Sequence, residues 1–176
     1  MDTDTFWQLI EDARAASADP SDGEAVAARA SELLAQRPPA EILAAQQTLW
    51  DLMAVSYSTP LWGAAYLING GCSDDGFDYF RGWLIVQGRT VFEQAVADPD
   101  SLAAVPAVGD AAPHGCLECE DALSIVWDAH ESATGTGLDD AHWTIDYPDL
   151  GDDWDFDDSE ATARHLPRLT ELYGDG

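Results

Sequence analysis

Apolar residues recur every three or four positions along most of this chain, which is the spacing of amphipathic helices. A cap at Thr3 or Asp4 precedes the first such stripe, and a proline-containing segment ends it. A second stripe predicts a helix from about Glu24 to Gln36, and Pro39 is placed to open a third helix. Three helices with short connections indicate a bundle.

The same spacing continues through the middle and the end of the chain. The further predicted helices run from Leu61 to Ile68, from Ser73 or Asp74 to about Ala97, from Glu118 to Thr134, and from about Ser159 to Tyr173. Residues 101–115 have no period and indicate a connector, while residues about 138–158 form an acidic-aromatic loop. Almost no two-residue alternation, the mark of strands, is present. We therefore predict an all-α fold, a single-domain helical bundle of about six to seven helices with a loop-rich C-terminal third.

Length and charge narrow the classes of function. A chain of 176 residues is long enough for one well-buried core, so we expect a single helical domain over residues 1–176. The formal net charge of −27 argues against nucleic acid and anionic membrane surfaces, because each phosphate contact needs a Lys or Arg. The chain has no lysine, which excludes catalysis through a lysine Schiff base and a phosphate-binding loop of the Gly-Lys-Ser/Thr type.

Two interpretations of the acidity remain open. The carboxylates can form a solvated coat that keeps the protein soluble, or they can recruit a basic protein partner. No apolar run is long enough to span a bilayer, and the acidic opening lacks the positive charge of a secretory signal. Three cysteines, an odd number, fit reduced thiols better than disulfides. We therefore expect a cytoplasmic protein.

The segment from Pro60 to Arg89 concentrates aromatic rings, carboxylates and two of the few arginines. We predict a ligand-binding cluster here, formed by Trp62, Tyr66, Asp74, Asp75, Asp78, Arg81, Trp83 and Arg89. In one interpretation, Arg81 and Arg89 lie on one side of the predicted long helix and clamp a carboxylate or phosphate of a small anionic ligand. In the other, Arg81 forms a buried structural ion pair with Asp78, three residues before it.

The acids at positions 74, 75 and 78 match an Asp-Asp-x-x-Asp pattern that holds magnesium in isoprenoid-type enzymes. Divalent ions need further oxygen ligands, and no partner motif supplies them. Acids in the first turn of a helix also satisfy its free amide groups and oppose its dipole. We expect this structural role, with a weak magnesium or calcium site as the alternative, and we predict no cofactor and no metal.

Two thiols lie at the spacing of metal ligands, at Cys116 and Cys119, next to His114. Cys72 offers a fourth ligand, so zinc binding is one interpretation and a redox role is another. Cys119 falls on the apolar stripe of its predicted helix, which favours a small core residue. The sequence leaves the three roles open.

Two blocks of this sequence resemble a bacterial family known as domain of unknown function 4240. They are Phe6-Trp7-x-Leu9-Ile10 and the central block Ser73-Asp74-Asp75-Gly76-Phe77-x-Tyr79-Phe80-Arg81-Gly82-Trp83-Leu84-Ile85. Weaker likeness extends through Thr134-Gly135 to Trp154-x-Phe156-Asp157-Asp158 and Leu166-Pro167-Arg168-Leu169. The resemblance implies a complete single-domain protein, and it implies no activity.

Three functions are compatible with these patterns. The first is a helical binding or regulatory module that holds a small anionic ligand or a partner segment at the predicted cluster. The second is an enzyme in which a carboxylate of the cluster, its pKa raised by apolar rings, acts as general acid or base while Arg81 orients the substrate. The third is an acidic immunity-like or nucleic-acid-mimic protein that binds a basic partner through its outer carboxylates. A filled core around a fully paired Arg81 favours the third.

Overall fold

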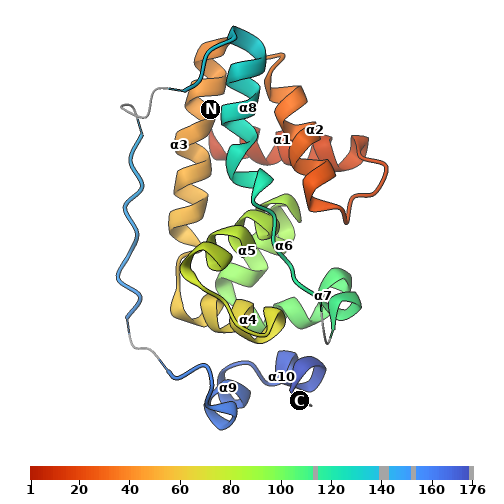
Figure 1. Ribbon diagram of the computed structural model, residues 1–176, viewed down its shortest axis with the longest axis vertical. Coiled ribbons are helices and arrows are strands. Elements are labelled where there is room, and N and C mark those ends of the chain that lie inside the picture. Colours follow the sequence, from red (N-terminus) through yellow and green to blue (C-terminus); the bar gives the residue numbers. More distant parts are fainter. Residues whose placement is uncertain (113–114, 139–142, 152–153, 175–176) are drawn as a thin grey trace.

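The structure, a computed structural model, describes residues 1–112, 115–138, 143–151 and 154–174. Every regular element in this part of the chain is a helix, and it contains no strand (Figure 1). The elements are α1 (Thr3–Ala16), α2 (Gly23–Leu34), α3 (Pro39–Val55), α4 (Thr59–Asn69), α5 (Asp74–Val86), α6 (Arg89–Ala97), the 3-10 helix η1 (Pro99–Ala104), α7 (Pro106–Ala111), α8 (Asp121–Thr134), α9 (Ser159–His165) and α10 (Pro167–Tyr173). The predicted all-α class is confirmed.

Short polar side chains fix the starts of several helices. Asp2, Asp22 and Ser73 each accept a hydrogen bond from a backbone N–H of the first turn that follows. At the end of α4, Gly70 adopts a left-handed conformation with φ of 67°, as the sequence Asn-Gly-Gly predicts. These local signals explain why these three helix starts and the end of α4 can be predicted from the sequence.

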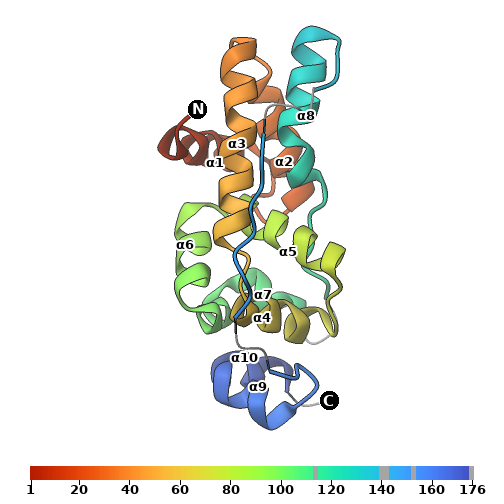
Figure 2. The same ribbon diagram turned by 90° about the vertical axis from the view of Figure 1, so that its left-hand side faces the viewer.

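The helices are arranged along one long axis. At one end α8 packs against α2 and α3, and α1 packs against α2. At the other end α10 packs against α4, α9 and η1. Figures 1 and 2 show residues 143–151 running along the molecule beside α3, from the α8 end towards the α9 and α10 end. The last quarter of the chain therefore connects the two ends.

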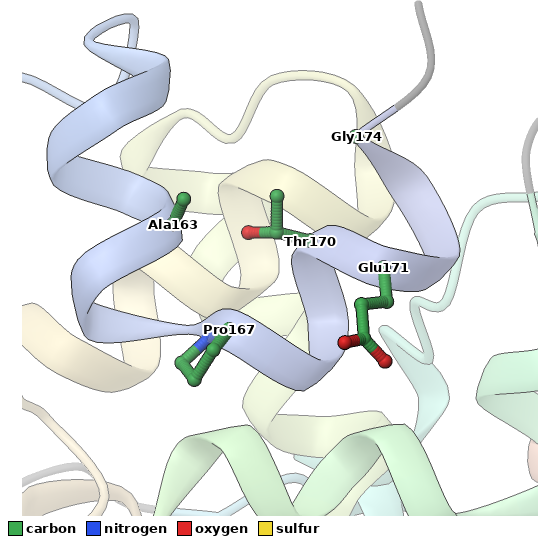
Figure 3. A pocket seen from close by; sticks show the side chains of 5 residues that line it. All are labelled: Ala163, Pro167, Thr170, Glu171 and Gly174. Carbon is green, nitrogen blue, oxygen red and sulfur yellow. The ribbon is translucent and has the colours of Figure 1, made fainter.

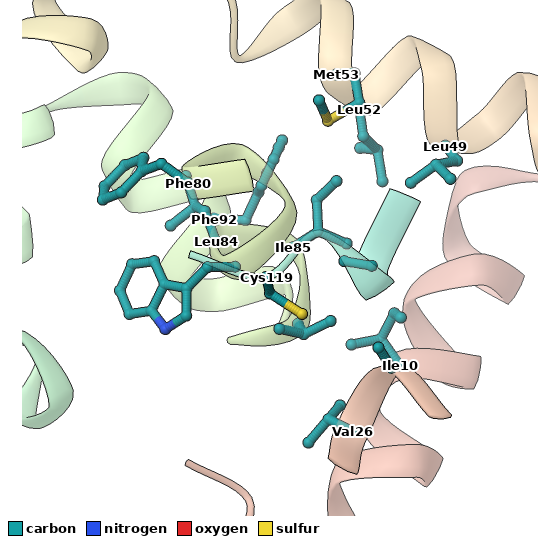
Figure 4. Packing of buried hydrophobic residues seen from close by; sticks show 14 of the residues in the cluster. Ile10, Val26, Leu49, Leu52, Met53, Phe80, Leu84, Ile85, Phe92 and Cys119 are labelled. Carbon is teal, nitrogen blue, oxygen red and sulfur yellow. The ribbon is translucent and has the colours of Figure 1, made fainter. Parts of the chain in front are cut away.

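The buried apolar side chains form one continuous cluster that includes residues from α1 to α10. Figure 4 shows Leu84 and Ile85 of α5 in its interior, with Leu49 of α3, Ile10 of α1 and Val26 of α2 around them. A Cβ atom on Gly82 would overlap the carbonyl oxygen of Cys119. The segment that leads into α8 therefore packs directly on the α5 backbone, the close approach that a mid-helix glycine permits.

The prediction of one long helix from residue 73 or 74 to about 97 is wrong. The helix ends after Val86, and α6 begins at Arg89. Gly88 between them has φ of 94°, a backbone conformation that L side chains rarely adopt. The apolar stripe continues through α6 at the same spacing, so the periodicity conceals the break.

The chain also has more helices than the six to seven expected. Besides the break at Gly88, the predicted connector contains η1 and α7, and the last predicted helix divides into α9 and α10. Pro99, Pro106 and Pro167 each occupy the first position of a short helix, where a missing N–H costs nothing. In the predicted loop, the described residues between 138 and 158 are in no helix, and residues 139–142 and 152–153 lie outside the described part.

No helix in the described residues is long and apolar enough to cross a membrane.

Candidate functional site

The break at Gly88 separates the two arginines of the predicted clamp. Arg81 lies on α5 and is fully buried, whereas Arg89 begins α6 with a side chain that is 45% exposed. Arg89 forms ion pairs of 2.6 Å with both Asp4 and Glu93. These bonds raise the pKa of the Arg89 guanidinium above its usual value. The two guanidinium groups have separate partners and do not form one site.

Arg81 has a hydrogen-bond partner for each of its three nitrogens. Nη1 donates to the carbonyl oxygen of Met53 on α3, Nη2 donates to the carboxylate of Asp78, and Nε donates to the carbonyl oxygen of Phe77 at 3.3 Å. The Asp78 side chain remains 40% exposed, so it connects the buried cation to solvent. This is the intrahelical pair that the spacing of three residues predicts.

Aromatic rings enclose the same guanidinium. Its central carbon lies 4.7 Å from the ring centre of Phe77, 5.0 Å from that of Tyr57 and 5.1 Å from that of Tyr147. These distances are typical of cation–π contacts. Arg81 is therefore held by carbonyls, a carboxylate and rings of its own chain, and it lines none of the cavities described below for residues 1–112, 115–138, 143–151 and 154–174.

The other predicted residues of the cluster divide among four places. Trp62 stacks on Phe77 with ring centres 4.8 Å apart and donates its N–H to the carbonyl oxygen of Cys72 at 3.0 Å. Trp62 and Arg81 thus share one neighbour. Trp83 is buried and packs against Phe80 with ring centres 5.4 Å apart.

The carboxylates of Asp74 and Asp75 lie in the first turn of α5, and both residues are exposed. The side chain of Ser73 caps this turn by accepting from the N–H of Gly76 at 3.2 Å. Acids at this place interact favourably with the positive end of the helix. The structural role expected for them is therefore compatible with the geometry.

Tyr66 contacts the C-terminal part of the chain. Its hydroxyl donates to Asp157 at 2.7 Å, and its ring lies 5.5 Å from that of Phe156. The bond to Asp157 is the largest cause that raises the pKa of the Tyr66 hydroxyl. The phenol is therefore occupied by a carboxylate of its own chain.

Residues 143–151 and 154–158 lie over the part of the predicted cluster around Arg81 and Tyr66, which the sequence pattern does not predict. The rings of Tyr147 and Tyr57 lie 4.3 Å apart, and Thr59 donates to the carbonyl oxygen of Leu150 at 2.8 Å. A Cβ atom on Gly63 would overlap the ring of Trp154, so this glycine of α4 provides the surface on which the indole lies. The richness in Trp and Tyr is the one signal that this segment packs against the fold.

A cavity of about 220 Å³ remains beside this cover, lined by Thr59, Trp62, Leu150 and Phe156. None of these four residues is charged, so the cavity offers an anion no countercharge. A wider hollow of about 510 Å³ lies between α9 and α10 (Figure 3), lined by Ala163, Pro167, Thr170, Glu171 and Gly174. Its one ionisable side chain is Glu171, and it contains no predicted site residue.

The three cysteines are free thiols. Burial is the largest cause that raises the pKa of Cys72 to about 12 and the pKa values of Cys116 and Cys119 to about 11 each. Thiols with such pKa values keep their protons near neutral pH, whereas nucleophilic reactions need the thiolate. Cys119 is buried in the core, as its place on the apolar stripe indicates. His114 lies outside the described residues.

Among the described residues, no group of three or more His, Cys, Asp or Glu side chains is arranged to hold a metal ion.

Sequence reasoning did not identify a third cavity, of about 190 Å³. It is lined by Gln46, Trp50, Leu123, Ser124, Trp127, Leu138 and Trp143. Trp50 and Trp127 are on two helices whose pairing the sequence does not specify, so the periodicity gives no sign of it. The content of seven tryptophans in an acidic chain is the available signal.

Comparison with protein families matches residues 1–132 of this chain to the family described as Protein of unknown function (DUF4240). The match includes the opening block and the central block, while the weaker likeness at residues 154–158 and 166–169 lies beyond it. No curated protein and no solved structure matches the chain. Because the family match covers 132 of the 176 residues, the chain belongs to the DUF4240 family.

Proposed function

We propose that this protein is an acidic helical binding module whose partner is a basic protein. The observation that carries the proposal is that the few arginines are bound within the chain, so the surface left for a partner is anionic. The arginines with a carboxylate or carbonyl partner in the same chain are Arg14, Arg29, Arg37, Arg81, Arg89 and Arg168. The sequence has seven arginines and 34 acids, so most carboxylates have no cation of their own chain to neutralise them.

The geometry gives less support to an anion clamp. Arg81 would have to leave three hydrogen bonds and three rings before it could contact a ligand. Withdrawing the guanidinium would leave the buried carbonyl oxygen of Met53 unpaired, which costs about 1–3 kcal/mol, and would also break the contacts with the three rings. An enzyme that uses Arg81 to orient its substrate would meet the same cost.

We also propose that the protein acts as a single domain in the bacterial cytoplasm. The single-domain part rests on the continuous hydrophobic core. Three free cysteines fit a reducing compartment. The bacterial origin rests on the family resemblance.

The test is the binding of a fluorescently labelled arginine homopeptide of about nine residues, measured by anisotropy at increasing NaCl concentration. We expect binding at about 0.15 M salt, and an affinity at least tenfold weaker at about 0.5 M, because salt screens the attraction between opposite charges. A glutamate homopeptide of equal length is the control and should not bind. No binding of the arginine peptide at low salt, or an affinity independent of salt, would contradict the proposal.

A further inference from the structure

The cavity formed by three tryptophans lies where α3 and α8 run side by side (Figures 1 and 2). Trp50 comes from α3, Trp127 from α8, and Trp143 from the segment that follows α8. We call this cavity, whose lining also includes Gln46, the tryptophan pocket. Its volume of about 190 Å³ is below the range of pockets for drug-sized ligands, roughly 300–1,000 Å³, and is suited to a single side chain.

Hydrogen bonds hold one wall of the pocket in place. The indole N–H of Trp143 donates to the carbonyl oxygen of Leu43 on α3 at 3.0 Å. The amide of Gln47 binds both backbone groups of Thr144, donating at 3.0 Å and accepting at 3.3 Å. Because these bonds join the segment to α3 next to the pocket, the Trp143 ring is positioned before any ligand arrives.

The turn after α8 supports a second wall. A Cβ atom on Gly137 would lie 3.0 Å from Cζ2 of Trp127, so the glycine backbone packs directly on this ring. The hydroxyl of Thr134 donates to the carbonyl oxygen of His130 at 2.8 Å, and one ring nitrogen of His130 lies 2.9 Å from the carbonyl oxygen of Thr136. Trp127 is nevertheless 43% exposed, one of the few large apolar side chains at the surface of the described residues. A supported but exposed indole can receive a ligand on its free surface.

Gln46 adds a polar group to the lining of the pocket. The residue is 5% exposed and lines the pocket, yet its side chain has no hydrogen bond to any described group. Among the described residues, the buried side-chain atoms without a partner are Nε of Arg29 and Nε2 of Gln87, so the amide atoms of Gln46 still reach solvent at the pocket. Its carbonyl oxygen can accept from an N–H donor, and Ser124 adds a hydroxyl to the same lining.

The charges around the pocket favour a ligand group with a positive charge. No basic residue of the described part of the chain lines it, and Glu131, one helical turn after Trp127, lies on the same face of α8. Asp128, one turn after Ser124, has a pKa raised by burial and then by the charges of Asp121 and Glu131. Carboxylates that repel one another beside the exposed indole of Trp127 favour a cation, because the ring face is itself negative.

We propose that the tryptophan pocket receives an arginine side chain of the basic partner. A guanidinium stacks on indole, donates to the Gln46 carbonyl oxygen and is attracted by the carboxylates of α8, whereas an ammonium lacks the planar fork. The inference rests on the proposed function and adds the place and the residue type that is recognised.

The experiment compares arginine and lysine homopeptides of equal length on the wild-type chain, Trp127→Leu and Trp127→Phe, by anisotropy at about 0.15 M NaCl. None of these changes alters the net charge, so attraction by the acidic surface alone is the same in all three. We expect Trp127→Leu to weaken arginine-peptide binding about three- to thirtyfold, and Trp127→Phe to restore part of it. Wild type should prefer arginine over lysine, and Trp127→Leu should lose this preference.

A second measurement does not depend on the variants. In wild-type protein labelled with nitrogen-15, the arginine peptide should shift the indole N–H signals of Trp127 and Trp50, while that of the buried Trp83 stays in place. Thermal unfolding of each variant checks that it is folded, and the half-exposed position of Trp127 favours this.

The two proposals fail in different ways. If the wild-type chain binds the arginine peptide and Trp127→Leu binds it equally well, or if the two indole signals do not move, the tryptophan pocket is overturned and the basic-partner proposal stands. If the wild-type chain does not bind the peptide at low salt, the proposed function fails, and the pocket proposal fails with it.

Discussion

At the scale of single residues, Arg81 and Arg89 offer a matched test of what buried and exposed cations contribute. We expect Arg81→Met to lower the free energy of unfolding by about 2–4 kcal/mol, because the carbonyl oxygen of Met53 and the three rings lose their cation while the volume is kept. For a chain of this size, that is a fall in Tm of roughly 5–15 °C by circular dichroism.

The control is Arg89→Met, which removes two ion pairs whose members are all about half exposed or more. Ion pairs exposed to solvent contribute little to stability, so Tm should change by only a few degrees. Equal effects of the two substitutions would mean that the internal contacts of Arg81 do not stabilise the fold.

Arg81 also shows which contacts can be predicted from the sequence and which cannot. The spacing of three residues correctly predicts the pair of Arg81 with Asp78. It does not reveal that Tyr57 and Tyr147 lie on the same guanidinium, because they come from a turn after α3 and from a segment without periodicity. A cation near aromatic residues is visible in the sequence, but whether it faces a ligand or the core depends on these distant contacts.

At the scale of elements, Asp100 of η1 stabilises the start of α10. Its carboxylate, within a residue that is 5% exposed, accepts from the backbone N–H of Arg168 at 3.1 Å and of Leu169 at 2.9 Å, and from Nε of Arg168 at 2.9 Å. Burial alone would raise the pKa of Asp100, but these hydrogen bonds outweigh burial and hold the pKa below its ordinary value of 3.8.

A depressed pKa means that Asp100 stabilises the fold fully above pH 3.8 and loses this effect as the pH falls through its lower folded value. We expect Asp100→Asn to cost about 1–3 kcal/mol at pH 7, and the difference in Tm from wild type to shrink below about pH 4. Asp98→Asn, at an exposed pair with the same arginine, is the control and should have a small effect. A difference between wild type and Asp100→Asn that stays constant from pH 7 to 3 would contradict this role.

The limits of the helix predictions have a physical cause. Caps and prolines act within a few residues, so signals such as Ser73 and Pro39 are readable from the sequence. The turn at Gly88 depends on a backbone angle, and the stripe on its two sides has the same spacing. The cover by residues 143–151 and 154–158 uses single aromatic contacts such as Trp154 on Gly63, which leave no period to detect.

At the scale of the whole molecule, residues beyond the family match contact residues within it at the predicted cluster. The match ends at residue 132, yet Tyr147 and Leu150 from beyond it contact Tyr57 and Thr59 within it. The tryptophan pocket is formed in the same way, with Trp50 and Trp127 inside the matched region and Trp143 outside. The last quarter of the chain therefore completes surfaces that the matched region presents.

The net charge of −27 predicts how the stability of the whole fold responds to salt. Folding brings the carboxylates together, so their mutual repulsion lowers the free energy of unfolding. Salt weakens this repulsion, because the screening length falls from roughly 30 Å at 0.01 M to 3 Å at 1 M. Salt also weakens exposed ion pairs such as Arg89 with Asp4, but these contribute little. Repulsion among 34 acids against seven arginines should dominate, so we expect NaCl to raise Tm by roughly 3–10 °C over this range.

Sucrose at equal osmolarity is the control, because it stabilises by exclusion without screening charge. In Asp128→Asn the gain from salt should be smaller than in wild type, since Asp128 has a pKa raised by burial and by its acidic neighbours on α8. For the same reason this variant should be slightly more stable than wild type at pH 7 and low salt, because a raised carboxyl pKa means that ionisation opposes folding. A Tm that falls with NaCl would mean that the ion pairs outweigh the repulsion among the carboxylates. A basic partner would then relieve less repulsion on binding, and the electrostatic reason for the proposed interaction would be weaker.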